Sequence, residues 1–410
     1  MNYIENILSA HSGGKEVKAG EFLLAECDVV LINDVTGPLA VKNFLSSGGR
    51  IKNPASVVIV CDHFTPNKDI KSAQNVKFLR DFAKKCNVSF LETDGVEHVV
   101  LPEKGIVTSG DVVIGADSHT CTYGALGAFS TGVGSTDAAY AMLTGKIWFK
   151  VPEVVDFVYT GKMKKFVTGK DLILYTIGKI GVEGANYKAM KFSGPVIDAL
   201  PMDGRFTMCN MAIEAGAKCG FVAPDGKTKE YLRGRGLKKP KFFSAGNSTK
   251  KIRIDAGEIP PVVAVPHRPD KIRSAKKLNK IKIDQVVIGS CTNGRLSDFA
   301  AASKILKGKK IRRGLRVIIL PGSRMVYGEA LAAGYIETFL KAGCIISPPT
   351  CGPCLGGHMG ILADGEIAVS TTNRNFVGRM GSTSSKVYLA SPYVAAASAL
   401  TGRITSPEQL

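Results

Sequence analysis

The sequence lacks most of the features that mark membrane and secreted proteins. No uninterrupted apolar run reaches the ~18 residues that a membrane-spanning helix needs. Residues 1–10 contain asparagine, glutamate and serine in place of the basic and apolar segments of a secretory signal. Ten cysteines among 410 residues are far below the density of a secreted disulfide scaffold. These absences predict a cytoplasmic protein with reduced thiols and no membrane association.

Acidic residues are also scarce: 35 Asp and Glu stand against 54 Lys and Arg, which gives a net charge of +19. The excess is concentrated in residues 227–253, with ten basic residues and one acid, and in residues 304–316, with seven basic residues and no acid. Such an excess can mark a nucleic-acid footprint, a docking surface for an acidic partner or a field that steers an anionic substrate. No nucleic-acid-binding signature accompanies the charge, which argues against nucleic acid. A solvated surface accounts for most of these lysines.

Only one residue is tryptophan, whereas 45 are glycine and 45% are apolar, a composition ordinary for a loop-rich α/β protein. A chain of 410 residues is too long for one simple core and suits two or three α/β domains. An α/β block closes near residue 152, and the Pro-rich, basic stretch 260–282 has the character of a linker. We therefore expect three domains, which comprise residues 1–152, residues 153–275 with the basic insert, and residues 276–410.

Five short runs rich in β-branched residues are typical of strands buried on both faces of a parallel sheet. Each run is followed at once by polar residues that can take part in chemistry. In open α/β sheets ligands bind beyond the carboxyl ends of the strands, so we expect these ends to share one cleft. The runs lie at residues 56–60, 111–115, 285–289, 315–320 and 366–370.

Three helices are expected close to these runs. Residues 75–86 have an amphipathic spacing, and Ser135-Thr136-Asp137 can cap a helix that ends at Gly145. Residues 296–306 form a third candidate helix, whose amino terminus lies just after Cys291. A helix amino terminus at that position would help to stabilise a thiolate.

Three cysteines stand apart from the others. Cys351 and Cys354 are separated by two residues in the turn T-C-G-P-C-L-G-G, and Cys291 follows a predicted strand in G-S-C-T-N-G-R. The pair fits half of an iron–sulfur site, half of a zinc site that His358 can complete, or a thioredoxin-type dithiol. Glycines leave room for the sulfurs of a cluster near backbone amides, which favours an iron–sulfur cluster held by three thiolates. One iron would then lack a protein ligand and act as a Lewis acid.

The remaining cysteines and one glycine-rich turn have plainer interpretations. The turn G-V-G-S-T-D at residues 132–137 can cradle an anion at a helix amino terminus, but it lacks the full dinucleotide-binding pattern and is interpreted as a packing turn. Apolar or tight surroundings predict small core residues at Cys27, Cys61, Cys86, Cys209, Cys219 and Cys344.

Three of the six histidines lie beside acids, at strand ends or in loops. Pairing with a carboxylate can keep an imidazole charged and ready to protonate a leaving hydroxyl. Arg374 and Arg379 in N-R-N-F-V-G-R have the planar guanidinium that binds a carboxylate in bidentate fashion, although both can also be surface residues. The histidines occur in the sequences Asp62-His63, Glu97-His98 and Asp117-x-His119.

Four motifs in the order G-A-D-S-H-T, G-S-C-T-N-G-R, T-C-G-P-C-L-G-G and N-R-N-F-V-G-R resemble the aconitase superfamily, in particular its members whose large subunit is a separate chain. The resemblance extends from near His11 to the region of Ser391. It implies three α/β/α domains around an iron–sulfur cleft. It also implies a 4Fe–4S cluster on Cys291, Cys351 and Cys354, with the fourth iron binding the hydroxyl and a carboxylate of the substrate.

The resemblance also implies roles for individual residues. Asp62 and His63 match a pair that helps to protonate the departing hydroxyl, and His98, Asp117 and His119 match residues that support it. Asn33 falls where larger family members use a glutamine to bind substrate. Positions that match contacts to the cluster, its bound water or a substrate carboxylate are Asn210, Glu214, Asn373, Arg374 and Arg379.

The implied activity is that of a hydro-lyase of leucine synthesis, which isomerises 2-isopropylmalate to 3-isopropylmalate by dehydration and rehydration. The alternatives are isomerisation of homocitrate, dehydration of a smaller branched malate and, in another class, cluster-sensing RNA binding, which only the net charge supports. The sequence ends at Leu410 without the swivelling fourth domain of single-chain aconitases. We therefore expect a separate small subunit to supply that domain and its catalytic serine.

Overall fold

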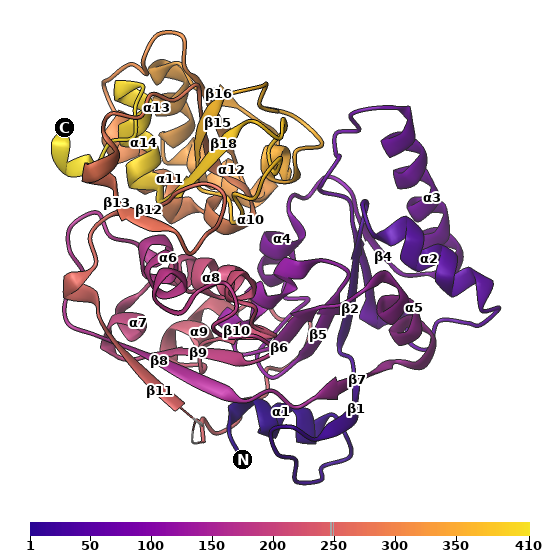
Figure 1. Cartoon of the computed structure of the whole chain (residues 1–410). Coiled ribbons are helices and arrows are strands. Elements are labelled where there is room, and N and C mark those ends of the chain that lie inside the picture. Colours follow the sequence, from indigo (N-terminus) through magenta and orange to yellow (C-terminus); the bar gives the residue numbers. More distant parts are fainter. Residues whose placement is uncertain (247, 249) are drawn as a thin grey trace. The chain divides into compact units, whose positions relative to one another are not determined.

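The computed structural model describes every residue of the chain except 247 and 249, which lie within the basic segment 227–253. The chain forms two compact units, both of α/β type (Figure 1). Neither unit is one continuous stretch, and the division into three domains remains a prediction. Unit 1 comprises residues 1–92, 100–160 and 185–254, and unit 2 comprises residues 93–99, 161–184 and 255–410.

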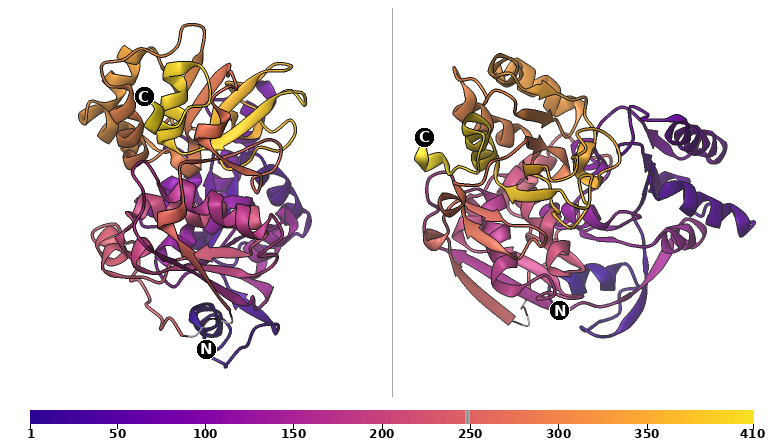
Figure 2. Two further views of the ribbon diagram at one scale, coloured as in Figure 1. Left: turned by 60° about the vertical axis from the view of Figure 1, so that its left-hand side comes forward. Right: turned by 45° about the horizontal axis from the view of Figure 1, so that its top comes forward.

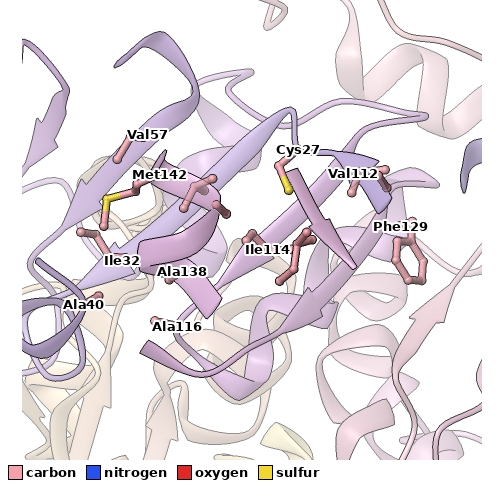
Figure 3. Close-up of a cluster of buried hydrophobic side chains, with 14 of the residues drawn as sticks. Cys27, Ile32, Ala40, Val57, Val112, Ile114, Ala116, Phe129, Ala138 and Met142 are labelled. Atoms are coloured by element: carbon pink, nitrogen blue, oxygen red, sulfur yellow. The ribbon is translucent and has the colours of Figure 1, made fainter. Parts of the chain in front are cut away.

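The first sheet of unit 1 is fully parallel, with strand order β4-β3-β2-β5-β6. Predicted strands at 56–60 and 111–115 are confirmed as β3 and β5. Apolar side chains from β2, β3, β5 and β6 belong to one buried cluster, to which helix α5 contributes Ala138 and Met142 (Figure 3). The strands are β2 (Val29–Asn33), β3 (Val57–Val60), β4 (Ser89–Leu91), β5 (Val112–Gly115) and β6 (Phe129–Gly132), and the helices beside them are α2 (Gly37–Ser46), α3 (Ile70–Cys86) and α5 (Ser135–Thr144).

Unit 1 contains two further sheets. One has the order β10-β9-β8-β11, and in the other β1 (Phe22–Glu26) pairs antiparallel with β7 (Lys146–Lys150). The fully buried Arg205 in α8 binds both carboxylate oxygens of Asp225, at 2.9 and 2.6 Å, and so fixes the helix that ends at Asn210. The elements are β8 (Val154–Thr160), β9 (Ala189–Ser193), β10 (Cys219–Phe221), β11 (Lys250–Asp255), α1 (Tyr3–Ala10), α7 (Pro195–Ala199), α8 (Met202–Asn210) and α9 (Gly226–Leu232).

Unit 2 is built on a seven-stranded sheet of order β13-β12-β18-β17-β14-β15-β16. The five strands from β18 to β16 are parallel, and the predicted strands at 285–289, 315–320 and 366–370 are confirmed as β14, β15 and β17. Helices α11, α13 and α14 pack side by side along the strands (Figure 2). The elements are β12 (Val262–Ala264), β13 (Ile272–Ser274), β14 (Gln285–Gly289), β15 (Arg316–Leu320), β16 (Ile345–Ile346), β17 (Ile367–Ser370), β18 (Lys386–Ala390), α6 (Gly169–Ile180), α10 (Ser290–Asn293), α11 (Leu296–Leu306), α12 (Arg324–Ala332), α13 (Tyr335–Ala342) and α14 (Pro392–Thr401).

Two expectations need correction. The stretch 260–282 is not a linker, because it contributes the antiparallel strands β12 and β13 to one edge of the sheet of unit 2. The prolines that made it resemble a linker, at positions 260, 261, 266 and 269, lie outside both strands and so remove no hydrogen bond from them. Helix α3 begins at Ile70, five residues before the predicted start, because the Asp69 side chain accepts a hydrogen bond from the Ser72 N–H at 2.7 Å. The five predicted strands come from two sheets, because β3 and β5 lie in unit 1 and β14, β15 and β17 lie in unit 2, and the shared cleft stays a prediction.

Other expectations are refined or confirmed. Helix α5 has Gly134 at its N-cap position, and Asp137 accepts a hydrogen bond from the Gly134 N–H at 3.3 Å. The candidate helix at residues 296–306 is confirmed as α11. In the part of the chain that the structure describes, no helix combines the length and apolarity that crossing a membrane requires.

Candidate active site

The carboxyl ends of β2, β3 and β5 bring three acids of unit 1 around one histidine. His63 Nδ1 lies 2.6 Å from Asp62 Oδ1, and its Nε2 lies 3.6 Å from Asp117 Oδ2. Asp34 accepts hydrogen bonds from the backbone N–H groups of Asp62 and His63 at 3.1 and 3.0 Å, and of Phe64 at 2.7 Å. These bonds hold the turn after β3 in place. The structure thus unites the predicted Asp62, His63 and Asp117.

The charges around His63 favour its protonated form. Burial alone lowers the pKa of His63, but the Asp62 carboxylate and hydrogen bonds to Asp117 and Asp62 outweigh burial. The pKa of His63 is therefore held well above its usual value. A histidine that stays charged at neutral pH can donate a proton to a leaving hydroxyl.

A second histidine of unit 1 is paired with a glutamate. His119 Nε2 lies 2.9 Å from Glu214 Oε1. The backbone N–H of His119 donates a hydrogen bond to Asp117 Oδ1 at 2.7 Å. Asp117 therefore connects the surroundings of the two histidines. Asn210 donates through Nδ2 to Thr122 Oγ1 at 2.9 Å, so it lies next to the short helix that carries His119 (Ser118–Leu126).

Two further predicted features of unit 1 have local structural roles. The Asn33 side-chain oxygen accepts hydrogen bonds from the backbone N–H groups of Val35 and Thr36, both at 3.0 Å, and so forms the turn into α2. At Gly132 a Cβ atom would lie 2.7 Å from the Asp117 carbonyl oxygen. The glycine-rich stretch therefore lets the end of β6 approach the turn that carries Asp117, which agrees with the packing interpretation.

In unit 2 the three predicted cysteines are buried around one asparagine. The side chains of Cys291, Cys351 and Cys354 are 4%, 6% and 2% exposed. Asn373, just beyond β17, donates through Nδ2 to Cys291 Sγ at 3.3 Å, and its Oδ1 accepts from Cys354 Sγ at 3.5 Å. Ser290 Oγ lies 3.9 Å from Cys351 Sγ. Residues up to 82 positions apart in the chain thus form one thiol site.

The thiol of Cys291 is placed by an unusual backbone at the end of β14. Gly289 has φ 139° and Ser290 has φ 64°, both in the region that most residues avoid. Ser290 Oγ donates to the Cys351 carbonyl oxygen at 3.2 Å, which ties this turn to the cysteine loop. Strained residues of this kind concentrate at functional sites.

Replacement of Gly289 by alanine is expected to reduce the free energy of unfolding by at least about 3 kcal/mol. The cost of a strained backbone angle and the cost of a new close contact both contribute to this loss. The added Cβ would collide with the carbonyl oxygen of Leu320 in the neighbouring strand. Gly308 is the matched control, since its φ is 72° and no atom lies within 4 Å of a Cβ there. Alanine at position 308 should cost about 1 kcal/mol. Urea unfolding of both variants measures the difference, and equal losses would contradict this interpretation.

The other predicted residues of unit 2 lie around the thiols or next to them in the chain. Arg379 Nη2 donates to Cys354 Sγ at 3.8 Å, and both Arg374 and Arg379 are half-buried. The backbone oxygen of His98 accepts a hydrogen bond from Arg295 Nη2 at 3.0 Å. The imidazole Nε2 of His98 lies 3.5 Å from Glu97 Oε1. Arg295 belongs to the motif that contains Cys291, so His98 is tied to that motif.

Sequence reasoning missed three residues of these sites. Asp34 follows a buried strand as Asp62 does, so the strand-end rule could have found it. Ser290 precedes Cys291, but only the backbone angle reveals its role. Lys170 has no local signal, although it is fully buried and donates hydrogen bonds to the backbone just before Asn373.

Five of the six cysteines predicted to be small core residues are buried, and the sixth packs against the edge of the core. Cys27, Cys61, Cys209, Cys219 and Cys344 are buried free thiols, and Cys86 is half-buried. Burial raises the pKa of Cys344 and of Cys219 to about 12. These residues are therefore small apolar core residues and not thiolate ligands.

Comparisons with known proteins give the family. A model of the aconitase family (aconitate hydratase) matches residues 5–402. Over 417 residues the chain is 57% identical to the 3-isopropylmalate dehydratase large subunit of Thermodesulfovibrio yellowstonii, covering 100% of this chain and 99% of the relative. It is also 57% identical, over 420 residues and with the same coverage, to 3-isopropylmalate dehydratase large subunit 1 of Pyrococcus furiosus. Holo-form aconitase X of Thermococcus kodakaraensis has a similar fold, with a TM-score of 0.52, 16% identity and coverage of 85% of this chain and 84% of that chain. The chain therefore belongs to the aconitase family.

Proposed function

We propose that this chain is the large, catalytic subunit of a hydro-lyase that isomerises 2-isopropylmalate to 3-isopropylmalate in leucine synthesis. The observation that carries the proposal is the 57% identity, over the full length of both chains, to relatives named 3-isopropylmalate dehydratase large subunit. The two sets of residues described above supply the chemistry that this reaction needs.

The buried thiols of Cys291, Cys351 and Cys354 are proposed to hold a 4Fe–4S cluster. The burial of all three thiols and the contacts of Asn373, at 3.3 Å to Cys291 Sγ and 3.5 Å to Cys354 Sγ, support a shared site for one bound group. Asn373 and Arg379 provide hydrogen bonds to the sulfurs, as iron–sulfur sites require.

Such a cluster, when bound, would supply a Lewis-acidic iron that polarises the C–OH bond of the substrate. The protonated His63, oriented by Asp62 and Asp117, is proposed to give its proton to the departing hydroxyl. The pair of His119 and Glu214, together with His98, supports proton transfer and water binding. Arg374 and Arg379 are proposed to bind substrate carboxylates, with Asn33, Asn210 and Asn373 as further contacts.

A separate small subunit is proposed as the partner, in keeping with the words "large subunit" in the names of the relatives. By the same resemblance, that subunit would carry a swivelling domain and the serine that removes the proton from the carbon next to the hydroxyl. Substrate choice would then depend partly on the partner. This is why homocitrate and smaller branched malates remain the alternative substrates.

The test is turnover by the reconstituted pair. The chain, loaded anaerobically with iron and sulfide, is assayed with and without its cognate small subunit on 2-isopropylmalate, homocitrate and a methyl-substituted malate. We expect the highest kcat/KM for 2-isopropylmalate and almost no turnover by the large chain alone. A higher kcat/KM for homocitrate would show that homocitrate, and not 2-isopropylmalate, is the substrate. Full activity of the isolated chain would refute the need for a partner.

A further inference from the structure

Lys170 is a buried cation that forms no ion pair with a carboxylate in the described part of the chain. It lies in the first turn of α6 and is 0% exposed. Its Nζ donates to the backbone carbonyl oxygens of Thr371 at 2.7 Å and Thr372 at 2.5 Å. Among the residues that the structure describes, no Asp or Glu forms an ion pair with this ammonium group. Carbonyl dipoles alone compensate poorly for the loss of hydration of a full charge.

Nearby acids have other partners. The adjacent Asp171 accepts hydrogen bonds from the backbone N–H groups of Val262 at 3.0 Å and Thr168 at 2.8 Å. Asp298 accepts from Asn293 Nδ2 at 2.9 Å and from the Arg295 N–H at 3.1 Å. Both carboxylates raise the pKa of the lysine from a distance, but neither forms an ion pair with it, so a further source of negative charge would stabilise its ammonium form.

The thiol site is that source. Burial lowers the pKa of Lys170 to about 7. Negative charge on Cys291 raises this pKa, and its effect is larger than those of Asp298 and Cys354. Two of the three proposed ligands thus lie close enough to act on the ammonium charge. The lysine also holds the two carbonyl groups that immediately precede Asn373, the residue between Cys291 and Cys354.

We propose that Lys170 is a positioning residue of the thiol site, which carries the countercharge for a thiolate-bound cluster when that cluster is present and anchors the backbone that places Asn373. This inference rests on the proposed function, because it requires the thiols to bind a negatively charged group. It explains why a lysine is buried on α6 without an acid. Its charge acts through the protein interior, where screening is weak.

The countercharge has a consequence that can be measured without turnover. The net charge and hydrogen bonding around an iron–sulfur cluster set its reduction potential. A nearby cation stabilises the reduced form, which carries one more negative charge. Removal of the cation should therefore lower the potential and also weaken retention of iron.

The experiment compares Lys170→Met, which loses charge and hydrogen bonds, with Lys170→Gln, which keeps a hydrogen-bond donor but loses the charge. Lys179→Met is the matched control, because it removes the same charge from the exposed end of the same helix. Each protein is loaded with iron and sulfide and titrated with a reductant by electron paramagnetic resonance. In both Lys170 variants we expect the equilibrium constant for reduction of the cluster to fall at least tenfold. For a one-electron couple this corresponds to a reduction potential that is lower by 59 mV. They should also lose iron to a chelator at least tenfold faster.

Several results would decide against the proposal. Unchanged reduction potentials in both Lys170→Met and Lys170→Gln would overturn it. A lower potential in Lys170→Met alone would support the role of Lys170 as a backbone anchor and refute its role as a countercharge. If Lys170→Met does not fold, Lys170→Gln decides. Lys170→Arg, which keeps the charge, should restore the wild-type potential. If the wild-type chain itself binds no iron and sulfide, the proposed function fails; if it binds them and the Lys170 variants match it, only this inference fails.

Discussion

Replacement of Cys354 by serine is expected to lower turnover of the reconstituted enzyme by at least about a thousandfold, or about 4 kcal/mol of transition-state stabilisation. The thiol is 2% exposed and contacts Asn373 Oδ1 at 3.5 Å and Arg379 Nη2 at 3.8 Å. A serine hydroxyl in the same place is a harder and far more basic donor, and it would not replace a thiolate on iron. Iron and sulfide per chain, measured with turnover, test this prediction.

The control for this prediction is another buried cysteine of the same unit. Cys344 is 6% exposed, and burial raises its pKa to about 12, so it stays protonated. Serine at position 344 should destabilise the core slightly and leave iron content and turnover per folded chain unchanged. Wild-type iron content and turnover in Cys354→Ser would remove the basis of the proposed mechanism.

Replacement of Asp62 by asparagine is expected to lower turnover at neutral pH by about a hundredfold or more, the usual contribution of general acid catalysis. Asp62 is the main reason why the pKa of His63 stands well above its usual value, against the effect of burial. Without that carboxylate, only Asp117 and Asp34 are left to oppose the effect of burial, so the pKa of His63 falls. The imidazole then loses the proton that the leaving hydroxyl needs.

The sign of the pH dependence follows from the same pKa shift. In the wild-type enzyme, activity that depends on protonated His63 is present at low pH and is lost as pH rises through its raised pKa. In Asp62→Asn this loss of activity, the basic limb of the pH profile, should occur at lower pH. Part of the activity should therefore return on acidification. Profiles of kcat/KM against pH measure the shift.

Asp156→Asn is the control for the pH profile. Asp156 is 3% exposed and pairs with Ser193 Oγ and with Lys191, whose Nζ lies 3.1 Å from it. Its replacement removes a buried carboxylate of unit 1 that has no contact with His63. The basic limb should stay in place. An unchanged limb in Asp62→Asn would show that His63 does not act through this pair.

The accuracy of the strand predictions has a simple cause. The runs at β3, β5, β14, β15 and β17 are buried on both faces, so their sequences are continuously apolar and end where polar residues begin. The stretch 260–282 was misjudged because its two strands have only three residues each and are flanked by prolines and lysines, a composition that is also typical of linkers. The start of α3 was placed too late because Asp69 caps the helix by a side-chain hydrogen bond that an apolar periodicity does not register.

By itself, the sequence determined the elements whose signal is local: the buried strands, the helix after Cys291 and the motifs that carry the cysteines and the Asp–His pairs. Only the tertiary structure decided which of these meet. Sheet order places Asn373 between Cys291 and Cys354, and it brings Asp34 under the turn that carries His63. The contact of Lys170 with Thr371 joins residues 201 positions apart. Such contacts depend on strand order and on the burial of charge, which are properties of the assembled core that no local pattern of residues contains.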